Sequence, residues 1–287
     1  MEKKKIIVTG ANGQLGREIR ELAPGYPDFD FVFLTKEELP IQDAARILQF
    51  FEANRPIACI NCAAYTAVDK AESEQELAYA VNGTATGLLA AACSSTGARL
   101  FHVSTDYVFD GLSATPLKEG DPTDPINVYG ASKLQGEQLA LQLNKDTVIV
   151  RTSWVYSEFG NNFVKTMIRL MKERPSINVV NDQIGSPTYA ADLALVLVQI
   201  ATGSPFVPGI YHYSNEGSLS WYDFAVAIKE LTGSSCAVHP IPTTQFPTPA
   251  KRPHYSLLDK SLIKASYGIS VPEWKESLVR CLERLKK

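Results

Sequence analysis

The chain has 287 residues, of which 45% are hydrophobic and 21% are charged, and its net charge is -3. This length allows one large domain or two modest ones with a sizeable core. The near balance of charge gives no reason to expect nucleic acid or a membrane surface as a partner. No apolar run reaches transmembrane length, and the first residues lack the apolar region and cleavage site of a secretory signal, so we expect a cytosolic protein.

The cysteines and histidines do not suggest a disulfide framework or a metal site. Cys59 and Cys62 form a nominal C-x-x-C, but they fall in what reads as a buried strand and its end. No second cysteine pair or histidine cluster follows at ligand spacing, so we predict buried thiols and no bound metal. We also expect all four histidines to be structural or surface residues: His102, His212, His239 and His254.

A glycine-rich turn follows the first predicted strand. The strand spans residues 5–9, the glycines are Gly10, Gly13 and Gly16, and a helix continues to about Leu22. In dinucleotide-binding turns, one glycine allows the tight turn, one lets the backbone approach a pyrophosphate, and one permits close helix–strand packing. The helix N-terminus then offers free N–H groups to phosphate. Because the turn joins a strand to a helix, a dinucleotide site is favoured over a glycine-rich turn without a ligand.

The second predicted strand, residues 30–35, bears on cofactor choice. In NAD enzymes an acidic residue commonly ends this strand and binds the ribose 2′-hydroxyl. Here Thr35 and Lys36 occupy that region, and they tolerate a 2′-phosphate better than a carboxylate does. This favours NADPH, with NADH still open because Glu37 and Glu38 follow closely.

The next segments alternate between helix and strand. We predict a helix over 44–54, with Asp43 as its N-cap, as an adenine-side contact, or as both. A third strand over 57–61 ends in small residues, and residues 71–96 are helical with a break near Asn82. A fourth strand over 99–107 delivers Thr105 to the edge where open α/β sheets place their ligands.

A tyrosine and a lysine four residues apart follow the loop over 109–127. Tyr129 and Lys133 lie at the start of a predicted helix over 129–144, and positions i and i+4 share one helix face. A free tyrosine has a pKa of about 10, and a nearby cation lowers it. The pair is therefore typical of a proton donor with its tuning group.

A further strand over 147–154 completes the alternation, which predicts an α/β fold with a Rossmann-type doubly wound parallel sheet. After residue 155 the pattern is less regular, with helices over 163–173, 189–202 and 221–232, a strand over 178–181 and a proline-rich stretch over 240–253. We expect an NAD(P)-binding domain over 1–155 and a smaller α+β substrate-binding lobe over 156–287, with the chain free to cross back to the first domain.

These parts suit the reduction of a ketone by a nicotinamide cofactor. Negative charge develops on the carbonyl oxygen during hydride transfer, and that oxygen must be protonated. Tyr129 is expected to donate the proton while Thr105 hydrogen-bonds the same oxygen. Lys133 is expected to lower the pKa of Tyr129 and to hold the nicotinamide ribose.

The motifs TGANGQLG, STDYVFDG and YGASK resemble the extended short-chain dehydrogenase/reductases that act on nucleotide sugars. The match sharpens with AAYTAVDKAE, RTSWVY, GNNFVKTM, NDQIGSPT and PTPAKRPHYSLLD, which are similar to the dTDP-4-dehydrorhamnose reductase family. The resemblance spans essentially the whole chain. It implies NAD(P)H-dependent reduction of the C4 ketone of dTDP-4-dehydro-L-rhamnose, for cell-surface polysaccharide biosynthesis.

The resemblance also implies site residues. Its cofactor contacts fall on Gly13, Gln14, Leu15, Asp43, Ala44, Ala64, Tyr65, Thr66, Tyr129 and Lys133. Its substrate contacts fall on Thr105, Asp106 and Trp154. Asp106 and Trp154 also have structural interpretations, as a turn-stabilising acid and a core aromatic. Arg252 is our own addition, because a guanidinium pairs well with a diphosphate.

Two positions depart from the family pattern. Thr35 stands where the family has an acid. Some members form a homodimer with Mg²⁺ held by glutamates, and Glu18 matches one of these, but Ala191 stands at the position of another, which argues against that metal site.

Two other functions remain open on this scaffold. The first is a nucleotide-sugar epimerase or dehydratase, although the Asp-Glu pair expected of a dehydratase is missing beside Thr105. The second is a non-enzymatic NADP-binding regulatory subunit of methionine adenosyltransferase, which the intact set of Thr105, Tyr129 and Lys133 does not exclude.

Overall fold

A six-stranded parallel sheet forms the centre of the molecule, seen in a computed structural model that describes residues 3–286. Its order is β10-β5-β4-β3-β1-β2, so the strand order reverses between β1 and β3, the place where open α/β sheets bind ligands. The strands are β1 (Lys4–Thr9), β2 (Phe29–Leu34), β3 (Ala58–Asn61), β4 (Arg99–Thr105), β5 (Thr147–Thr152) and β10 (Gly209–His212).

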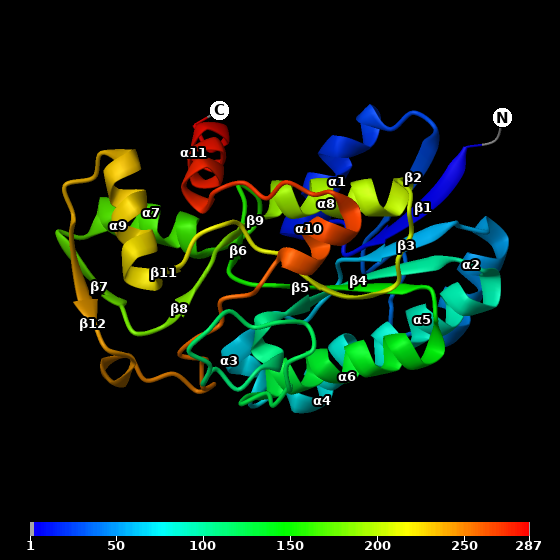
Figure 1. Ribbon diagram of the computed structural model, residues 1–287, viewed down its shortest axis with the longest axis horizontal. Coiled ribbons are helices and arrows are strands. Elements are labelled where there is room, and N and C mark those ends of the chain that lie inside the picture. The colour runs from blue at the N-terminus through cyan, green and yellow to red at the C-terminus, as the bar shows by residue number, and fades with distance from the viewer. Residues whose placement is uncertain (1–2, 287) are drawn as a thin grey trace.

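Helices cover both faces of this sheet (Figure 1). One layer holds α1 (Gln14–Leu22) and α8 (Ala190–Thr202), and the other holds α2 (Ala44–Asn54), α5 (Ala85–Thr96) and α6 (Val128–Leu143). Alternate residues of β1 enter the two cores: Ile6 and Val8 pack with Leu197 of α8, and Ile7 packs with Leu89 of α5. A strand buried on both faces needs this unbroken apolar run, which explains the sequence of β1.

A smaller lobe lies at the end of the molecule away from β2 (Figure 1). It contains α7 (Phe163–Glu173), α9 (Trp221–Thr232), α11 (Trp274–Arg284) and the parallel pair β7 (Ser176–Val180) and β12 (Ala237–Ile241). Two-residue strands join it to the sheet: β6 (Val155–Tyr156) pairs with β9 (Thr188–Tyr189), and β8 (Ile184–Gly185) with β11 (Leu219–Ser220). Tyr156, Phe224 and Leu278 lie in its core.

A long connection, which we call the strap (residues 246–259), runs from the lobe back over the main sheet domain. Tyr255 N–H donates to Gly111 O at 3.1 Å, and Asp259 N–H donates to Leu117 O at 2.8 Å. The strap therefore fixes the loop over 109–127 and leads into α10 (Ser261–Tyr267).

The predicted doubly wound parallel sheet is confirmed, and the helices over 44–54, 163–173 and 221–232 have the predicted bounds. The predicted break near Asn82 is wrong. The chain stays helical from α4 (Gln75–Ala78) through a π-helical turn, η2 (Tyr79–Thr84), into α5. A π turn is wider than an α turn, and it turns the Asn82 side chain towards α6 instead of ending the helix.

Several ends and elements differ from the prediction. β4 stops at Thr105, whose hydroxyl caps the short 3₁₀ turn η3 (Asp106–Val108), and β5 stops at Thr152. β10, β12, α10 and α11 were not predicted; β10 joins the main sheet although it follows the start of the lobe.

All five cysteines are free thiols, with Cys62 half-buried and the other four buried. Within residues 3–286, no helix combines the length and the apolar character needed to cross a bilayer.

Candidate functional site

A crevice of about 400 Å³, which we call the glycine crevice, opens at the carboxyl ends of β1 and β3. Backbone forms its floor. A Cβ on Gly10, whose φ is +67°, would lie 2.6 Å from Ala63 N, and a Cβ on Gly16 would lie 2.5 Å from Gly10 O. No side chain fits at either position, so the predicted roles of tight turn and close packing match the geometry.

The start of α1 borders the glycine crevice. Gly13 is its N-cap and offers no side chain to the free N–H groups that follow. Such N–H groups attract anions. Gln14 Oε1 accepts a hydrogen bond from Asn162 Nδ2 at 2.8 Å, which ties α1 to the start of α7, and Leu15 is buried in the core.

The outer rim of the crevice contains Thr35, Lys36 and Glu37. Glu38 is turned aside: its Oε2 accepts from Thr35 N–H at 2.8 Å, and its own N–H donates to Thr35 Oγ1 at 3.3 Å. Lys36 and Glu37 are therefore the charged side chains beside the pocket.

Asp43 and Ala44, expected as cofactor contacts at the α2 end of the crevice, are not among the residues that line it. Asp43 Oδ1 accepts from Arg46 N–H at 3.0 Å, so its carboxylate caps α2, which begins at Ala44. Its neighbours Ile41 and Gln42 line the crevice. The N-cap interpretation of Asp43 is thus the one with a visible contact.

The inner wall of the crevice includes Ala64 and Tyr65, with Thr66 exposed just beyond. Asn82 holds this wall in place, because its Oδ1 accepts from Tyr65 N–H at 2.8 Å and its Nδ2 donates to Tyr65 O at 3.0 Å. The same Nδ2 donates to Ser132 Oγ of α6 at 3.0 Å. The sequence analysis did not predict that Asn82 belongs to this site, because it identified Asn82 only as a break in a helix.

Tyr129 lies in the first turn of α6. Asn127 caps that turn by accepting from Gly130 N–H at 2.7 Å. A Cβ on Gly130 would lie 2.1 Å from Tyr107 O, so the glycine allows α6 to pack directly on the turn after Thr105. Desolvation raises the pKa of Tyr129 to about 12, and a hydrogen bond with the Thr105 hydroxyl opposes the rise. Thr105 and Tyr129 are therefore brought together as predicted.

Lys133 is buried, with 2% of its surface exposed. Its Nζ donates to Val103 O at 2.6 Å and lies 3.2 Å from His102 Nε2. Burial lowers the pKa of Lys133 to about 8, against the opposing charges of Glu137 and Cys62. The expected lowering of the Tyr129 pKa is absent here, since desolvation of the phenol outweighs any effect of an amine turned towards His102.

Asp106 is buried beside Thr105, whose Oγ1 donates to its Oδ1 at 3.0 Å. Burial raises the pKa of Asp106 to about 6, with Ser256 of the strap and Thr105 opposing the rise. The carboxyl thus faces the strap as well as the turn.

A second cavity of about 410 Å³, the lobe pocket, lies in the smaller lobe and is mostly apolar. Trp221 forms one wall and stacks on Trp154 with ring centroids 3.6 Å apart. Trp154 takes a φ of +48°, unusual for a bulky residue. The remaining lining comes from α7, β7 and the strap: Phe163, Thr166, Met167, Leu170, Arg174, Ile177, Asn178, Val179, Val180, Gln183, Phe246, Thr248 and Arg252.

Arg252 lines the lobe pocket and pairs with Asp69 of α3 (Val68–Ala71). Its Nη1 and Nη2 lie 3.0 and 2.9 Å from the two carboxylate oxygens, and Asp69 Oδ1 also accepts from Ala250 N–H at 3.2 Å. Asn127 Nδ2 donates to Lys251 O at 2.8 Å, so the residue that caps α6 also holds the strap. Asp69 was missed, because nothing in the sequence pairs it with a residue so far along the chain.

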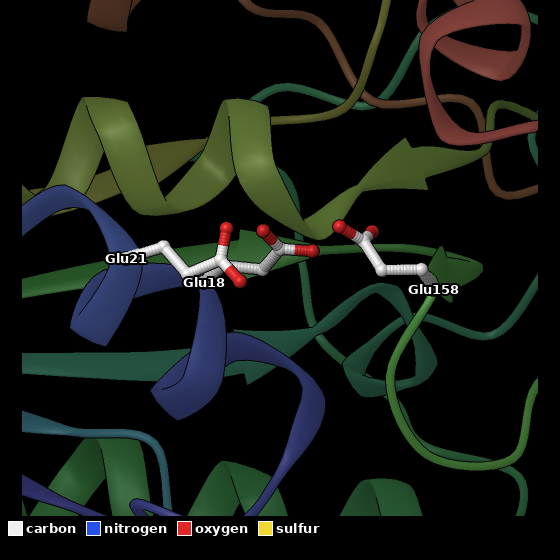
Figure 2. Close-up of side chains that lie close together, drawn as sticks. All are labelled: Glu18, Glu21 and Glu158. Atoms are coloured by element: carbon white, nitrogen blue, oxygen red, sulfur yellow. The ribbon is translucent and has the colours of Figure 1, made fainter. Parts of the chain in front are cut away.

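A cluster of three carboxylates joins α1 to the loop after β6. Figure 2 shows Glu18 and Glu21 of α1 and Glu158 from the loop after β6 with their carboxylates turned towards one another. Arg284 of α11 pairs with each of them. Carboxylates suit Mg²⁺, and in this structure the guanidinium of Arg284 is the cation that the three carboxylates share.

Comparison with known proteins identifies the family. The sequence pattern described as "RmlD substrate binding domain" matches residues 4–287. A dTDP-4-dehydrorhamnose reductase of Aggregatibacter actinomycetemcomitans is 43% identical over 284 residues, covering 96% of this chain and 97% of the relative.

Solved structures agree with that assignment. The crystal structure of a dTDP-4-dehydrorhamnose reductase from Clostridium acetobutylicum superposes with a TM-score of 0.96 at 44% identity, covering 99% of this chain and 100% of that one. A dTDP-4-dehydrorhamnose reductase from Bacillus anthracis, crystallised with NADP, gives 0.95 at 43% identity and the same coverage. The chain belongs to the RmlD substrate-binding-domain family, together with these dTDP-4-dehydrorhamnose reductases.

Proposed function

We propose that this protein reduces the C4 ketone of dTDP-4-dehydro-L-rhamnose to dTDP-L-rhamnose with NADPH. The observation that carries the proposal is the placement of Tyr129. Its phenol hydrogen-bonds Thr105 at the carboxyl end of β4, and the neighbouring Asp106 contacts Ser256 of the strap.

The glycine crevice is the proposed dinucleotide site. Gly10 and Gly13 line it and let a pyrophosphate approach the backbone closely, and the uncapped start of α1 after Gly13 supplies N–H donors. Ala64 and Tyr65 form its wall. Lys133, whose Nζ contacts Val103 O and His102 in this structure, is proposed to hold the nicotinamide ribose once the cofactor binds. The nicotinamide supplies the hydride when bound.

We infer a preference for NADPH over NADH. Lys36 and Thr35 stand at the rim and suit a 2′-phosphate, while Glu38 is occupied by Thr35 N–H. The relative from Bacillus anthracis was crystallised with NADP, which supports the same choice. Glu37 at the same rim opposes it, so the preference is expected to be modest.

The lobe pocket is the proposed site for the nucleoside diphosphate of the substrate. Its aromatic and aliphatic walls suit a stacked base, and Asn178 and Gln183 offer hydrogen bonds to its edge. Arg252 offers its guanidinium to the diphosphate. On this proposal residues 1–155 bind the cofactor and residues 156–287 bind the substrate, with α8 and β10 returning to the sheet domain.

The chemistry assigned to this chain is proton donation. A phenol with a pKa of about 12 holds its proton at neutral pH, so Tyr129 is poised to donate to the oxygen of the reduced ketone. The Thr105 hydroxyl has one proton, which Asp106 accepts in the free protein, and we propose that Thr105 redirects this proton to the same oxygen when the ketone binds.

The test is a turnover assay with dTDP-4-dehydro-L-rhamnose in which NADPH oxidation and the sugar product are both followed. Tyr129→Phe should lower kcat by roughly 10²- to 10⁴-fold, the usual worth of a general acid. Tyr107→Phe is the matched control, because the ring centroids of Tyr107 and Tyr129 are 5.7 Å apart but Tyr107 has no proposed catalytic role. Undiminished turnover by Tyr129→Phe contradicts the mechanism.

The same assay separates the other functions. A reductase releases one NADP⁺ for each sugar reduced, whereas an epimerase or dehydratase regenerates its cofactor and shows no net consumption. A regulatory subunit shows no turnover with this substrate.

A further inference from the structure

A buried chain of hydrogen bonds runs from Lys133 into the sheet. Lys133 Nζ lies 3.2 Å from His102 Nε2, and His102 Nδ1 lies 3.1 Å from Asn61 Nδ2. Asn61 Oδ1 accepts from Thr9 Oγ1 at 2.7 Å and from Ala63 N–H at 3.2 Å. Thr9, Asn61 and His102 are register partners on β1, β3 and β4, so the sheet itself holds the chain together.

The Ala63 contact fixes the direction of these bonds. A backbone N–H only donates, so the oxygen of the Asn61 amide must face Ala63 and the NH₂ group must face His102. That NH₂ group donates to His102 Nδ1, which is therefore the acceptor nitrogen. His102 is fully buried, and burial together with the charge of Lys133 lowers its pKa well below the ordinary value. The ring is thus neutral, with its one proton on Nε2.

This tautomer points an N–H group at Lys133. An ammonium has three N–H donors and no acceptor, whereas an uncharged amine has a lone pair that accepts the Nε2–H bond. The amine can still donate to Val103 O at 2.6 Å. We propose that His102, locked in its Nε2–H form by Asn61, is a positioning residue that stabilises the neutral amine of Lys133 and so weakens its affinity for a third proton in the free protein.

The charges around Lys133 decide how strongly its ammonium form is favoured. Glu137 lies one turn further along α6 but pairs with Arg151 of β5 at 2.7 Å, and the Cys62 thiol stands at the end of β3. Tyr129 precedes Lys133 by one turn, and Asp106 lies beside Tyr129. Burial outweighs the charges that favour the ammonium and lowers the pKa of Lys133 to about 8, so the amine and the ammonium exchange near physiological pH.

The consequence is a switch that responds to negative charge. An anion bound near Lys133 favours the ammonium, so the protonated fraction of Lys133 rises, the bond from Nε2–H is lost, and the ammonium is released from His102. That consequence rests on the function proposed above. The protonation of Lys133 in the free protein does not, so it is tested without cofactor, substrate or turnover.

The direct test is NMR on the free full-length protein labelled with ¹⁵N-histidine. Two-bond ¹H–¹⁵N correlations report the tautomer of each ring, and His102→Gln identifies the signal. We expect His102 to keep the Nε2–H form between about pH 6 and 8, below and above the ordinary histidine pKa. A proton on Nδ1, or an imidazolium, overturns the proposal. In Asn61→Asp a carboxylate replaces the NH₂ group, and the proton should move to Nδ1.

The second measurement follows Lys133 itself, by titration of its Cε and Nζ signals in lysine-labelled protein. In His102→Gln the side-chain oxygen can accept from an ammonium, so the midpoint should rise by about one pH unit, a tenfold gain in proton affinity. His239→Gln, an exposed histidine on β12, is the control and should leave the midpoint unchanged. An unchanged midpoint in a folded His102→Gln overturns the proposal; if that variant does not fold, the tautomer in the unaltered protein still decides.

Discussion

The floor of the glycine crevice is built from backbone, whereas the lobe pocket is built from side chains. In the crevice, a single added methyl at Gly10 would come within 2.6 Å of Ala63 N. The lobe pocket instead depends on Trp221, Met167 and Ile177, which come from three separate elements. The glycine turn at the floor of the crevice is encoded in one short stretch of sequence, whereas the lobe pocket exists only after distant segments have packed. The two should therefore respond differently to substitution.

The largest effect is expected from Gly10→Ala. The methyl has no room, and Gly10 has a φ of +67°, so the substitution should lower the free energy of unfolding by about 3–5 kcal/mol. Gly97→Ala is the matched control, because its φ is +72° but nothing lies within 4 Å of its added Cβ. It should lose only about 1–2 kcal/mol. Urea unfolding of both measures the difference, and equal losses would show that the crevice floor is not tightly packed.

Arg252→Met should damage substrate binding and leave the fold intact. The guanidinium is half-buried and its loss removes a charge-assisted contact to the proposed diphosphate, worth about 2–3 kcal/mol. We expect KM for the sugar nucleotide to rise by roughly 30- to 150-fold, with KM for NADPH unchanged. Asp69→Asn keeps the shape of its partner and should have a smaller effect. A rise in KM for NADPH instead would place Arg252 in the cofactor site.

These two examples show what the sequence alone could predict. The crevice and the proton donor depend on residues that lie close together in the sequence: Gly10, Gly13 and Gly16 for the first, Tyr129 and Lys133 for the second. Their spacing alone was therefore enough to predict a dinucleotide site and a proton donor. The pairing of Arg252 with Asp69 spans 183 residues, and no local pattern announces it. The lobe is joined to the sheet domain by strands of two residues, which are too short to show a hydrophobic periodicity in the sequence.

His102 shows a different limit. His102 was expected, like the other three histidines, to be a structural or surface residue, because it lies in no cluster with metal-ligand spacing. Only the register of β3 against β4, which sets it beside Asn61, reveals that its ring is oriented towards Lys133. Similarly, desolvation of Tyr129 follows from packing around Gly130 and not from the spacing of the pair, so the direction of its pKa shift could not be read from that spacing.

The contact between α1 of the sheet domain and α11 of the lobe should make the stability of the protein depend on pH. Burial, reinforced by Glu158, raises the pKa of Glu18 to about 8, with Arg284 opposing the rise. A folded-state pKa above the unfolded one contributes stability that is complete below about pH 4 and is lost as pH rises towards 8. Glu18→Gln should match the original protein near pH 5 and exceed its unfolding free energy near pH 8 by on the order of 2 kcal/mol.

The measurement is urea unfolding at both pH values. Glu21→Gln, at the exposed end of the same cluster, serves as the control and should keep the original pH dependence. A Glu18→Gln variant whose stability falls between pH 5 and 8 as steeply as that of the original protein would show that Glu18 is ionised throughout.

The smallest effect concerns the rim of the crevice. Lys36→Glu removes the cation proposed to meet the 2′-phosphate and should reduce the ratio of kcat/KM for NADPH over NADH by about 10-fold, or ~1.4 kcal/mol. Glu37→Lys should increase the same ratio by a similar factor. Steady-state kinetics with both cofactors decides, and a ratio unchanged in both variants would mean that neither side chain meets the ribose.

The central claim is that the two pockets bind two different ligands, and a binding experiment with two cavity-filling variants tests it most directly. Ala64 lines the glycine crevice and Thr166 lines the lobe pocket, so a tryptophan at either position fills one cavity and spares the other. Calorimetric titration of NADP⁺ and of dTDP should show that Ala64→Trp loses only NADP⁺ binding and Thr166→Trp loses only dTDP binding. Loss of dTDP binding in Ala64→Trp, with Thr166→Trp still binding dTDP normally, would contradict the account.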